Sequence, residues 1–145
     1  MIYKAEKQHI PAIAGLAIQM WDENTLEGLE ENFEEIMDSG ESAIFLLKLD
    51  GKAAGFAQCQ LRHDYVEGTE SSPVGYLEGI FVEEAYRKQG HAKELLKRCE
   101  QWAKEMNCTE FASDCGLDNE GSLAFHLKMG FLEANRIICF TKSIL

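Results

Sequence analysis

Residues 86–96 read YRKQGHAKELL, a stretch in which positive charge and small residues meet where a strand gives way to a helix. The chain carries a formal net charge of −11, so this basic cluster is a local feature. The first turn of a helix has unpaired backbone N–H groups and a partial positive charge, and it therefore binds anions. The pattern Arg87-x-x-Gly90-x-Ala92 predicts a cradle for a pyrophosphate, with an ordinary loop of solvated charges as the alternative.

This cradle differs from the two common phosphate-binding motifs. No Gly-Lys-Ser/Thr follows, as a P-loop requires, and only one of the three glycines of a dinucleotide-binding fingerprint is present. The residues that we expect to line the cradle are Arg87, Lys88, Gln89, Gly90, His91, Ala92 and Lys93.

Length and composition predict a single domain that spans residues 1–145. The chain is 46% apolar, has only two prolines and shows no linker-like stretch, so one hydrophobic core is expected. No apolar run is as long as a membrane span, and the first ten residues lack the layout of a signal peptide. We therefore expect a cytoplasmic protein with no membrane partner.

Charge and cysteine content exclude other classes of partner. The acidic balance leaves no broad basic surface for nucleic acid, and it suits a cationic ligand instead. The five cysteines are odd in number and irregular in spacing, which fits neither a disulfide framework nor a metal site. Reduced thiols and no metal are the expectation.

Hydrophobic periodicity predicts a mixed α/β order of elements. Strands are expected at 2–5, 42–49, 52–63, 74–84 and 109–114, with one or two more within 131–143. Helices are expected at 9–21, at 26–38, after Gly90 as far as Met106, and at 119–129. Asp50-Gly51 between two apolar runs predicts a tight hairpin.

Three motifs in the same order resemble the GNAT family, the Gcn5-related N-acetyltransferases. They are RKQGHA at 87–92, then Asn119 with Ser122 and Ala124, and finally MGF at 129–131. The resemblance implies an α/β (α+β) fold, the GNAT acyl-CoA N-acyltransferase fold, with a mixed, mostly antiparallel central sheet flanked by helices. It also implies acetyl-CoA as co-substrate, contacted by Ile80, Phe81, Val82, the 87–93 loop, Asn119 and Ser122.

A second set of stretches is similar to the aminoglycoside 6'-N-acetyltransferases within that family. It comprises Trp21, RHDYV at 62–66, SSPVGYLEGIFV at 71–82 and ASD at 112–114. This resemblance implies acetyl transfer from acetyl-CoA to the 6'-amine of aminoglycoside antibiotics by direct attack in a ternary complex. Antibiotic resistance would follow, and the resembling enzymes are commonly homodimers. The positions that match aminoglycoside contacts are Trp21, Tyr65, Glu78 and Asp114.

The chain departs from the family pattern at two positions. His126 stands where many members have a tyrosine as general acid, and Asn135 replaces an acidic acceptor-site residue. An imidazole can protonate a leaving thiolate near neutral pH, and a histidine that packs beside Phe125 or belongs to a structural network is the alternative.

The residues themselves supply candidates for the other parts of the reaction. Backbone N–H groups near Phe81 and Val82 are candidates for binding the carbonyl oxygen, provided that the strand parts from its neighbour there. Glu78 lies inside an apolar strand, where an ionisable group is costly unless it faces a cleft, and a solvent-facing edge position is the alternative. Asp114 ends a strand, and it is either an acceptor-site carboxylate or a turn or cap residue. Either carboxylate can hold the ammonium group or take its proton.

Nine carboxylates and no basic residue lie between Asp22 and Glu41. Most belong to a solvated helix face, but together they would attract a polycation to the acceptor side. Trp21 and Tyr65 are expected to flank sugar rings or to be part of the core. The alternatives to an aminoglycoside enzyme are a GNAT enzyme that acetylates a polyamine or a protein amine, and a non-catalytic CoA-binding module.

Overall fold

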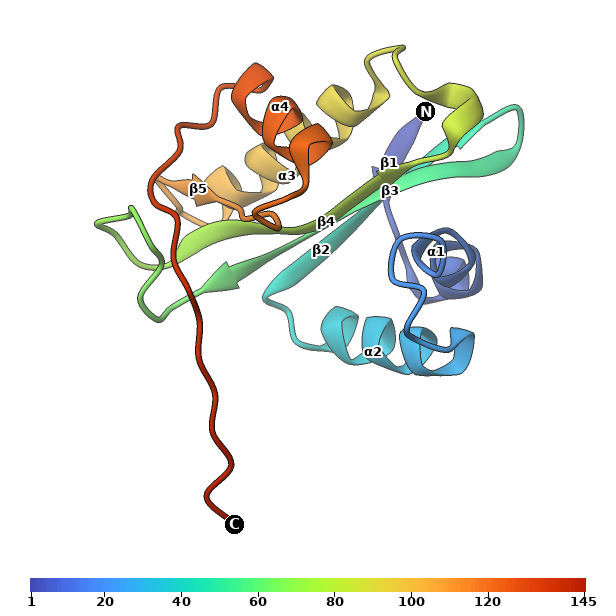
Figure 1. The fold of residues 1–145 in the computed structure, drawn as a ribbon. Coiled ribbons are helices and arrows are strands. Elements are labelled where there is room, and N and C mark those ends of the chain that lie inside the picture. Colours follow the sequence, from blue (N-terminus) through green and yellow to red (C-terminus); the bar gives the residue numbers. More distant parts are fainter.

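A five-stranded sheet in the order β1-β2-β3-β4-β5 forms the centre of the computed structural model, which describes all 145 residues (Figure 1). The first four strands pair antiparallel, and β5 runs parallel to β4. The predicted mixed, mostly antiparallel sheet is thus confirmed. The strands are β1 (Ile2–Lys4), β2 (Ser42–Leu49), β3 (Lys52–Arg62), β4 (Val74–Val82) and β5 (Phe111–Ala112).

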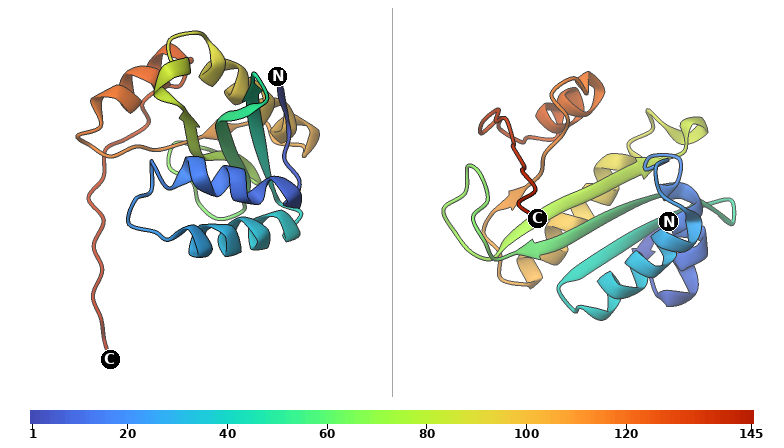
Figure 2. Two further views of the ribbon diagram at one scale, coloured as in Figure 1. Left: turned by 90° about the vertical axis from the view of Figure 1, so that its right-hand side faces the viewer. Right: turned by 60° about the horizontal axis from the view of Figure 1, so that its bottom comes forward.

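Helices cover both faces of the sheet (Figures 1 and 2). The first face carries α1 (Ile10–Ala17), after a short 3-10 turn η1 (Lys7–His9), and α2 (Leu26–Asp38). The second face carries α3 (His91–Glu105), and α4 (Glu120–Lys128) lies on the same side. A further 3-10 turn, η2 (Glu84–Tyr86), links β4 to α3.

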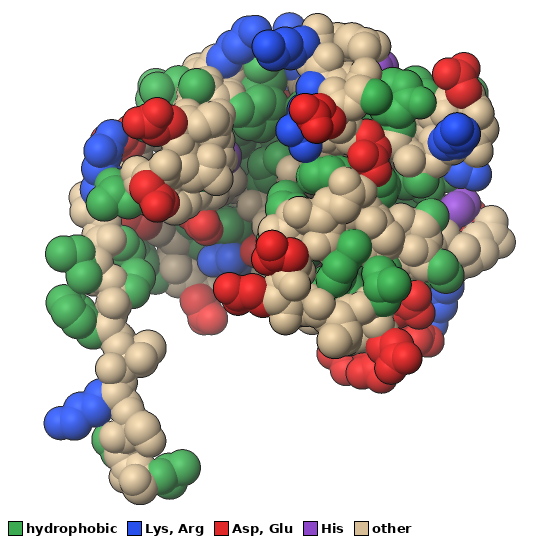
Figure 3. All heavy atoms as spheres, turned by 45° about the vertical axis from the view of Figure 1, so that its right-hand side comes forward, with side chains coloured by type: hydrophobic (Ala, Val, Ile, Leu, Met, Phe, Trp, Pro, Cys, Tyr) green, Lys and Arg blue, Asp and Glu red, His purple; other side chains and the backbone are tan.

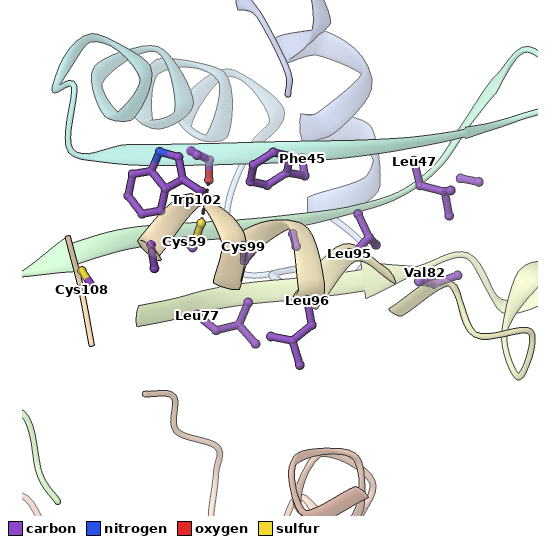
Figure 4. Close-up of a cluster of buried hydrophobic side chains, with 14 residues drawn as sticks. Phe45, Leu47, Cys59, Leu77, Val82, Leu95, Leu96, Cys99, Trp102 and Cys108 are labelled. Atoms are coloured by element: carbon purple, nitrogen blue, oxygen red, sulfur yellow. Dashed lines mark hydrogen bonds between the residues drawn. The ribbon is translucent and has the colours of Figure 1, made fainter. Parts of the chain in front are cut away.

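Two separate hydrophobic clusters hold these layers together. Under α3, the side chains of Leu95, Cys99 and Trp102 pack against the strands (Figure 4). Under α1 and α2, Phe33 and Phe56 meet edge to face with ring centroids 6.2 Å apart. Because the apolar stripe of each helix is buried on one side of the sheet, strand residues alternate between the two clusters.

The predicted hairpin at Asp50-Gly51 is confirmed. Both residues have positive φ values, 51° and 75°. Two positive φ values match the type I' geometry that two-residue hairpins favour, and Leu49 pairs directly with Lys52.

The strands predicted within 131–143 are wrong. Residues 132–145 form no helix or strand, and the end of this segment extends away from the body of the molecule (Figure 1). A strand needs a partner, and within this chain the sheet ends at the two-residue β5. The predicted helix at 9–21 also ends earlier, at Ala17, and is followed by turns.

Three absences complete the description. All five cysteines are free thiols. No cluster of three or more His, Cys, Asp or Glu side chains is placed to hold a metal ion. No helix combines the length and the apolar character needed to span a bilayer.

Gly75 allows β4, α3 and β5 to approach one another closely. A Cβ at this position would lie 2.7 Å from Ala103 Cβ and 2.7 Å from Phe111 Cδ1. The Phe111 ring can turn, but Ala103 Cβ is fixed to the α3 backbone. The pairing of β4 with β5 at this point therefore requires glycine at position 75.

We expect Gly75→Ala to lower the free energy of unfolding by about 1–3 kcal/mol, because the added methyl group overpacks the β4–α3 contact. Urea unfolding measures the change. Gly15→Ala is the matched control: Gly15 is exposed inside α1 with open space around it, so alanine should stabilise by about 0.4–1 kcal/mol. Equal stability of Gly75→Ala and wild type would contradict this account of the packing.

Candidate functional site

Four polar side chains from three parts of the sheet form one connected cluster. Arg62 Nε and Nη2 donate to the two Glu78 carboxylate oxygens at 3.1 and 3.0 Å. The Arg62 guanidinium carbon lies 3.5 Å from the centroid of the Tyr76 ring. Tyr76 donates its hydroxyl hydrogen to Asp114, just after β5. The structure thus brings together Glu78 and Asp114, the two carboxylates predicted from the sequence.

A β-bulge explains why Glu78 faces this cluster. Gln58 of β3 pairs with Gly79 and Cys59 pairs with Leu77, so Glu78 is the extra residue of β4. A bulge interrupts strict alternation and redirects a side chain. Glu78 and Gly79 are therefore both presented on the α1–α2 side, although they are consecutive.

Trp21 lies directly over Gly79. A Cβ on Gly79 would be 2.6 Å from Trp21 Cζ2 and 2.7 Å from Cη2. Trp21 also meets Phe56 edge to face at 6.1 Å and is only partly exposed. The indole of Trp21 therefore packs on the core and also lies over the bulged strand, so its position is compatible with both expectations, a core residue and a residue that flanks a sugar ring.

Tyr65 and Asn135 are joined through a residue that sequence analysis missed, Glu67. Tyr65 is 80% exposed, and its hydroxyl donates to Glu67 Oε2 at 3.0 Å. Asn135 Nδ2 donates to Glu67 Oε1 at 2.9 Å. The hydrogen bonds from Asn135 and Tyr65 lower the pKa of Glu67. A carboxylate thus lies beside Asn135, the position at which the family resemblance implies an acidic acceptor-site residue.

The burial and hydrogen bonding of the central cluster shift two further pKa values. Burial, followed by the hydrogen bond to Asp114, raises the pKa of Tyr76, so the hydroxyl remains a donor. Burial disfavours the charge of Arg62, but the hydrogen bond and charge of Glu78 outweigh it and raise the pKa of Arg62. Arg62 is therefore a permanent positive charge within the cluster.

The expected parting of β4 from its neighbour is present. β5 pairs with β4 only at Gly75 and Tyr76, so the edge of β4 from Leu77 to Val82 has no strand beside it. The Glu83 N–H donates to Ala54 of β3, and alternation turns the Val82 N–H to the open edge. Ile80 shares this orientation, whereas the Phe81 N–H points toward β3. The geometry therefore favours Val82 over Phe81 as an oxyanion donor.

The basic loop adjoins this open edge. Arg87 Nε donates to the Val82 carbonyl at 2.7 Å, which ties the loop to the end of β4. Gly90 is the N-cap of α3 with a φ of 85°, and a Cβ there would meet open space. Lys88 also has a positive φ, 63°. The first-turn N–H groups of α3, those of His91, Ala92 and Lys93, have no acceptor within the helix.

Asn119 and Ser122 begin α4. Asn119 is its N-cap, and Oδ1 accepts a hydrogen bond from the Ser122 N–H at 3.0 Å. A capping role explains this residue type independently of any ligand. The prediction that both contact a cofactor remains a prediction.

His126 has partners for both ring nitrogens. Nδ1 lies 2.7 Å from the Ser122 carbonyl oxygen, and Nε2 lies 2.8 Å from Ser113 Oγ. A carbonyl only accepts, so Nδ1 carries the hydrogen, and in the neutral ring Nε2 accepts from Ser113. The ring also packs against Phe125 and Phe131. This geometry favours the network role over that of a free acid.

Sequence analysis missed Arg62, Tyr76, Glu67 and Ser113 as members of the site. Their types carried little signal, since each is common in strands or loops. A signal did exist for Arg62 and Tyr76, because period-two alternation along paired strands places them on one face. Because the bulge at Glu78 was not predicted, the sequence did not indicate that Arg62 and Tyr76 form one cluster with Glu78.

Comparisons with known proteins show which family this chain belongs to. The model of the Acetyltransferase (GNAT) family matches residues 11–131. Aminoglycoside N(6')-acetyltransferase type 1 of Salmonella enteritidis is 38% identical over 141 residues, 97% of each chain. The protein of the same name from Serratia marcescens is 36% identical over 145 residues, 99% of each chain.

Two solved structures are similar over almost the whole chain. AAC(6')-Iy in complex with the bisubstrate analog CoA-S-monomethyl-acetylneamine has a TM-score of 0.95 and 38% identity, over 99% of this chain and 97% of that one. Apo AAC(6')-IG from Acinetobacter haemolyticus has a TM-score of 0.94 and 35% identity, over 99% of each chain.

Glu110 anchors the loop that carries Tyr65 to the start of β5. Its Oε1 accepts from the backbone N–H groups of Glu70 and Ser71, each at 2.9 Å, and from the Ser71 hydroxyl. The hydrogen bonds from the Ser71 side chain and the Glu70 backbone lower the pKa of Glu110 below its ordinary 4.5. A lowered folded-state pKa stabilises the fold above the ordinary value, and this contribution is lost as pH falls through the folded-state value.

We therefore expect Glu110→Gln to reduce the loss of stability that wild type shows as pH falls below 4.5, measured by urea unfolding at each pH. Glu35→Gln, an exposed carboxylate on α2, is the control and should follow wild type. If Glu110→Gln and wild type lose stability in parallel across this range, the loop anchor is not ionised as described.

Proposed function

The chain belongs to the acetyltransferase (GNAT) family, and we propose that it is an aminoglycoside 6'-N-acetyltransferase. It transfers the acetyl group of acetyl-CoA to the 6'-amine of aminoglycoside antibiotics and thereby gives resistance. One observation carries this proposal. The chain matches, over nearly its full length, the structure of AAC(6')-Iy with its bisubstrate analog CoA-S-monomethyl-acetylneamine.

The start of α3 fits the phosphates of CoA. The side chains of Arg87, Lys88 and Lys93 supply positive charge, and the first-turn N–H groups supply donors. The open space at Gly90 lets a ligand reach the backbone. Asn119 and Ser122 at the start of α4 are proposed as further contacts.

The open edge of β4 fits the thioester end of the same co-substrate. The Val82 N–H, directed to this edge, donates to the carbonyl oxygen as negative charge develops there. Ile80 and Phe81 provide the adjoining surface. The parting of β4 and β5 creates the room for this contact.

The carboxylates at the bulge fit the cationic acceptor. Glu78 and Asp114 hold the ammonium groups, while Trp21 and Tyr65 flank the sugar rings. Asn135, with Glu67 beside it, extends this end of the site. Polar and ionic contacts to several ammonium groups position the 6'-amine against the thioester.

The reaction is a direct attack in a ternary complex. The ammonium first loses a proton to Glu78 or Asp114, directly or through water. The amine nitrogen then forms a bond to the carbonyl carbon, the carbon–sulfur bond breaks with its electron pair on sulfur, and the nitrogen loses a second proton. His126 is the candidate that takes this second proton at Nε2, through its contact with Ser113, and returns it to the thiolate.

The acidic surface adds long-range attraction. Six carboxylates lie on α2, and acidic side chains gather over the lower part of the molecule, where α2 lies (Figure 3). Such a field raises the local concentration of a polycation and speeds its arrival. The same field suits polyamines, so they form part of the test below.

A cytoplasmic location is part of the proposal. In the cytoplasm the enzyme would meet acetyl-CoA and would act before an aminoglycoside reaches its target. The five free cysteines suit this reducing compartment. No contact with nucleic acid or membrane is needed for the reaction.

The test is acetyl transfer to a panel of amines, and the release of free CoA thiol measures the reaction. Kanamycin-type acceptors with a 6'-amine should react, and their 6'-hydroxyl analogues should not. Polyamines and peptides should react far more slowly. Faster turnover of a polyamine or peptide would replace the proposed acceptor, and no turnover with any amine would indicate a CoA-binding module.

Variants of the two carboxylates sharpen this test. Asp114→Ala and Glu78→Ala should each lower turnover by about a hundredfold or more. CoA affinity, measured by calorimetry, should stay near wild type because neither residue adjoins α3. Asp118→Ala, an exposed neighbour, is the control. Near wild-type turnover of both carboxylate variants would refute their assignment.

We also propose that the protein is a homodimer in which residues 132–145 of each chain pack on the other. This tail leaves large apolar side chains in solvent, at exposures from 63% for Ile137 to 91% for Leu132, and the terminal Leu145 is fully exposed. An exposed apolar segment of this size marks an interaction surface. Its base is held to the rest of the molecule by the hydrogen bond of 2.9 Å from Asn135 to Glu67. The outer edge of β5 in a second copy is the matching unpaired edge.

Light scattering with size exclusion tests this assembly. The full chain should have twice its monomer mass, and removal of residues 137–145 should give a monomer. Phe140→Asp should also weaken the dimer. Lys142→Ala, which removes a charged side chain in the same segment and no apolar one, should not. A monomeric full chain at micromolar concentration would contradict the proposal.

A further inference from the structure

Glu78, the carboxylate expected to meet a cationic acceptor, already has a cationic partner in this chain. Arg62 holds it through two hydrogen bonds of 3.0 and 3.1 Å, the bidentate arrangement that guanidinium and carboxylate groups favour. The Glu78 side chain is 19% exposed and that of Arg62 is 38% exposed. The pair is therefore partly shielded from water, and its charges act strongly on a group bound beside it.

Arg62 is held in place from a second direction. Its guanidinium lies over Tyr76, with the central carbon 3.5 Å from the ring centroid. Tyr76 is in turn fixed by its hydrogen bond to Asp114. Arg62 thus bonds one acceptor-site carboxylate directly and is linked to the other through a rigid aromatic ring.

The charge balance of the cluster follows from its members. The groups whose charges act on Arg62 are Glu78, Tyr76 and Asp114. With Tyr76 neutral, one positive and two negative charges leave one net negative charge. Trp21 covers the bulge from the α1 side, and the next residues along that loop, Asp22 and Glu23, are exposed.

We propose that Arg62 is a positioning residue that keeps the bound acceptor amine from being held as the unreactive ammonium ion. This inference rests on the proposed acetyl transfer. An ammonium has no lone pair and must lose a proton before it attacks. Two uncompensated carboxylates would bind the ammonium tightly and oppose that loss, whereas Arg62 cancels one of them and orients Glu78.

The consequence has a definite sign. Without the positive charge, the bound amine keeps its proton to higher pH, so the acidic limb of kcat against pH moves upward. We expect the limb to move by about 1–2 pH units, which is the usual effect of one adjacent charge. At neutral pH, kcat should then fall about tenfold for each pH unit by which the limb moves. The acceptor KM should fall at the same time, because the ammonium form is bound more tightly.

The experiment compares Arg62→Met with Arg62→Lys across pH, using a kanamycin-type acceptor and thiol release. Arg62→Met keeps the aliphatic stem and loses the charge, so its pH limb should move upward and its KM should fall. Arg62→Lys keeps the charge and loses the fork, so its pH limb should stay near wild type. A lower kcat for Arg62→Met with an unmoved limb would overturn the proposal, as would equal movement of the limb in both variants.

A binding measurement keeps the inference testable if turnover is too low to follow. Calorimetry in buffers of different ionisation enthalpy counts the protons released when the acceptor binds. Arg62→Met should release fewer protons than wild type and Arg62→Lys, with thermal unfolding as the check on folding. Equal proton release in Arg62→Met and wild type would overturn the inference alone, whereas an inactive wild type would overturn the proposed function.

Discussion

The parting of β4 from β5 is the constraint on which the rest of the molecule depends. The two strands share only two residue pairs, and the Gly75 N–H donates to the Glu110 carbonyl at 3.1 Å where they begin. Gly75 lacks a side chain, so α3 and Phe111 close over this point and fix where pairing starts and stops. Beyond Tyr76, the backbone N–H groups of β4 that face away from β3 consequently have no strand to pair with and can meet a ligand.

A single strand thus serves two ligands because it offers them different directions. Val82 presents its N–H within the plane of the sheet, at the open edge, and Arg87 ties the basic loop to the same residue. Glu78, four residues before Val82, points out of the sheet on the α1–α2 side because the bulge interrupts the alternation of side chains at this residue. Donor and acceptor therefore approach one short stretch of backbone without competing for the same surface. This separation explains why a basic loop and an acidic cluster coexist within a compact chain of strong negative charge.

The sequence predicts the parts of this arrangement that rest on local chemistry. The helix at 26–38, the hairpin at Asp50-Gly51 and the strand-to-helix turn at Gly90 each follow from periodicity or turn residues, and each is present. Glu78 and Asp114 could be singled out because a carboxylate in or beside an apolar strand is costly. The role of Arg62 could not be predicted, since a bulge is a property of two paired strands and leaves no mark on either one alone. The strands expected after Phe131 failed for a related reason: apolar residues with β propensity predict a strand only when a partner edge exists.

The distribution of charge suggests how tight capture and fast reaction are reconciled. Distant carboxylates on α2 attract a polycation through its total charge, and this attraction does not depend on which of its amines reacts. At the bulge the demand is opposite, because attraction that persists to the moment of attack stabilises the ground state and slows the reaction. Pairing Glu78 with Arg62 leaves a single net negative charge where the amine must lose its proton, while the outer surface keeps its full charge. Long-range attraction and a reduced local charge are therefore assigned to different residues, and a uniformly acidic site would bind well and react poorly.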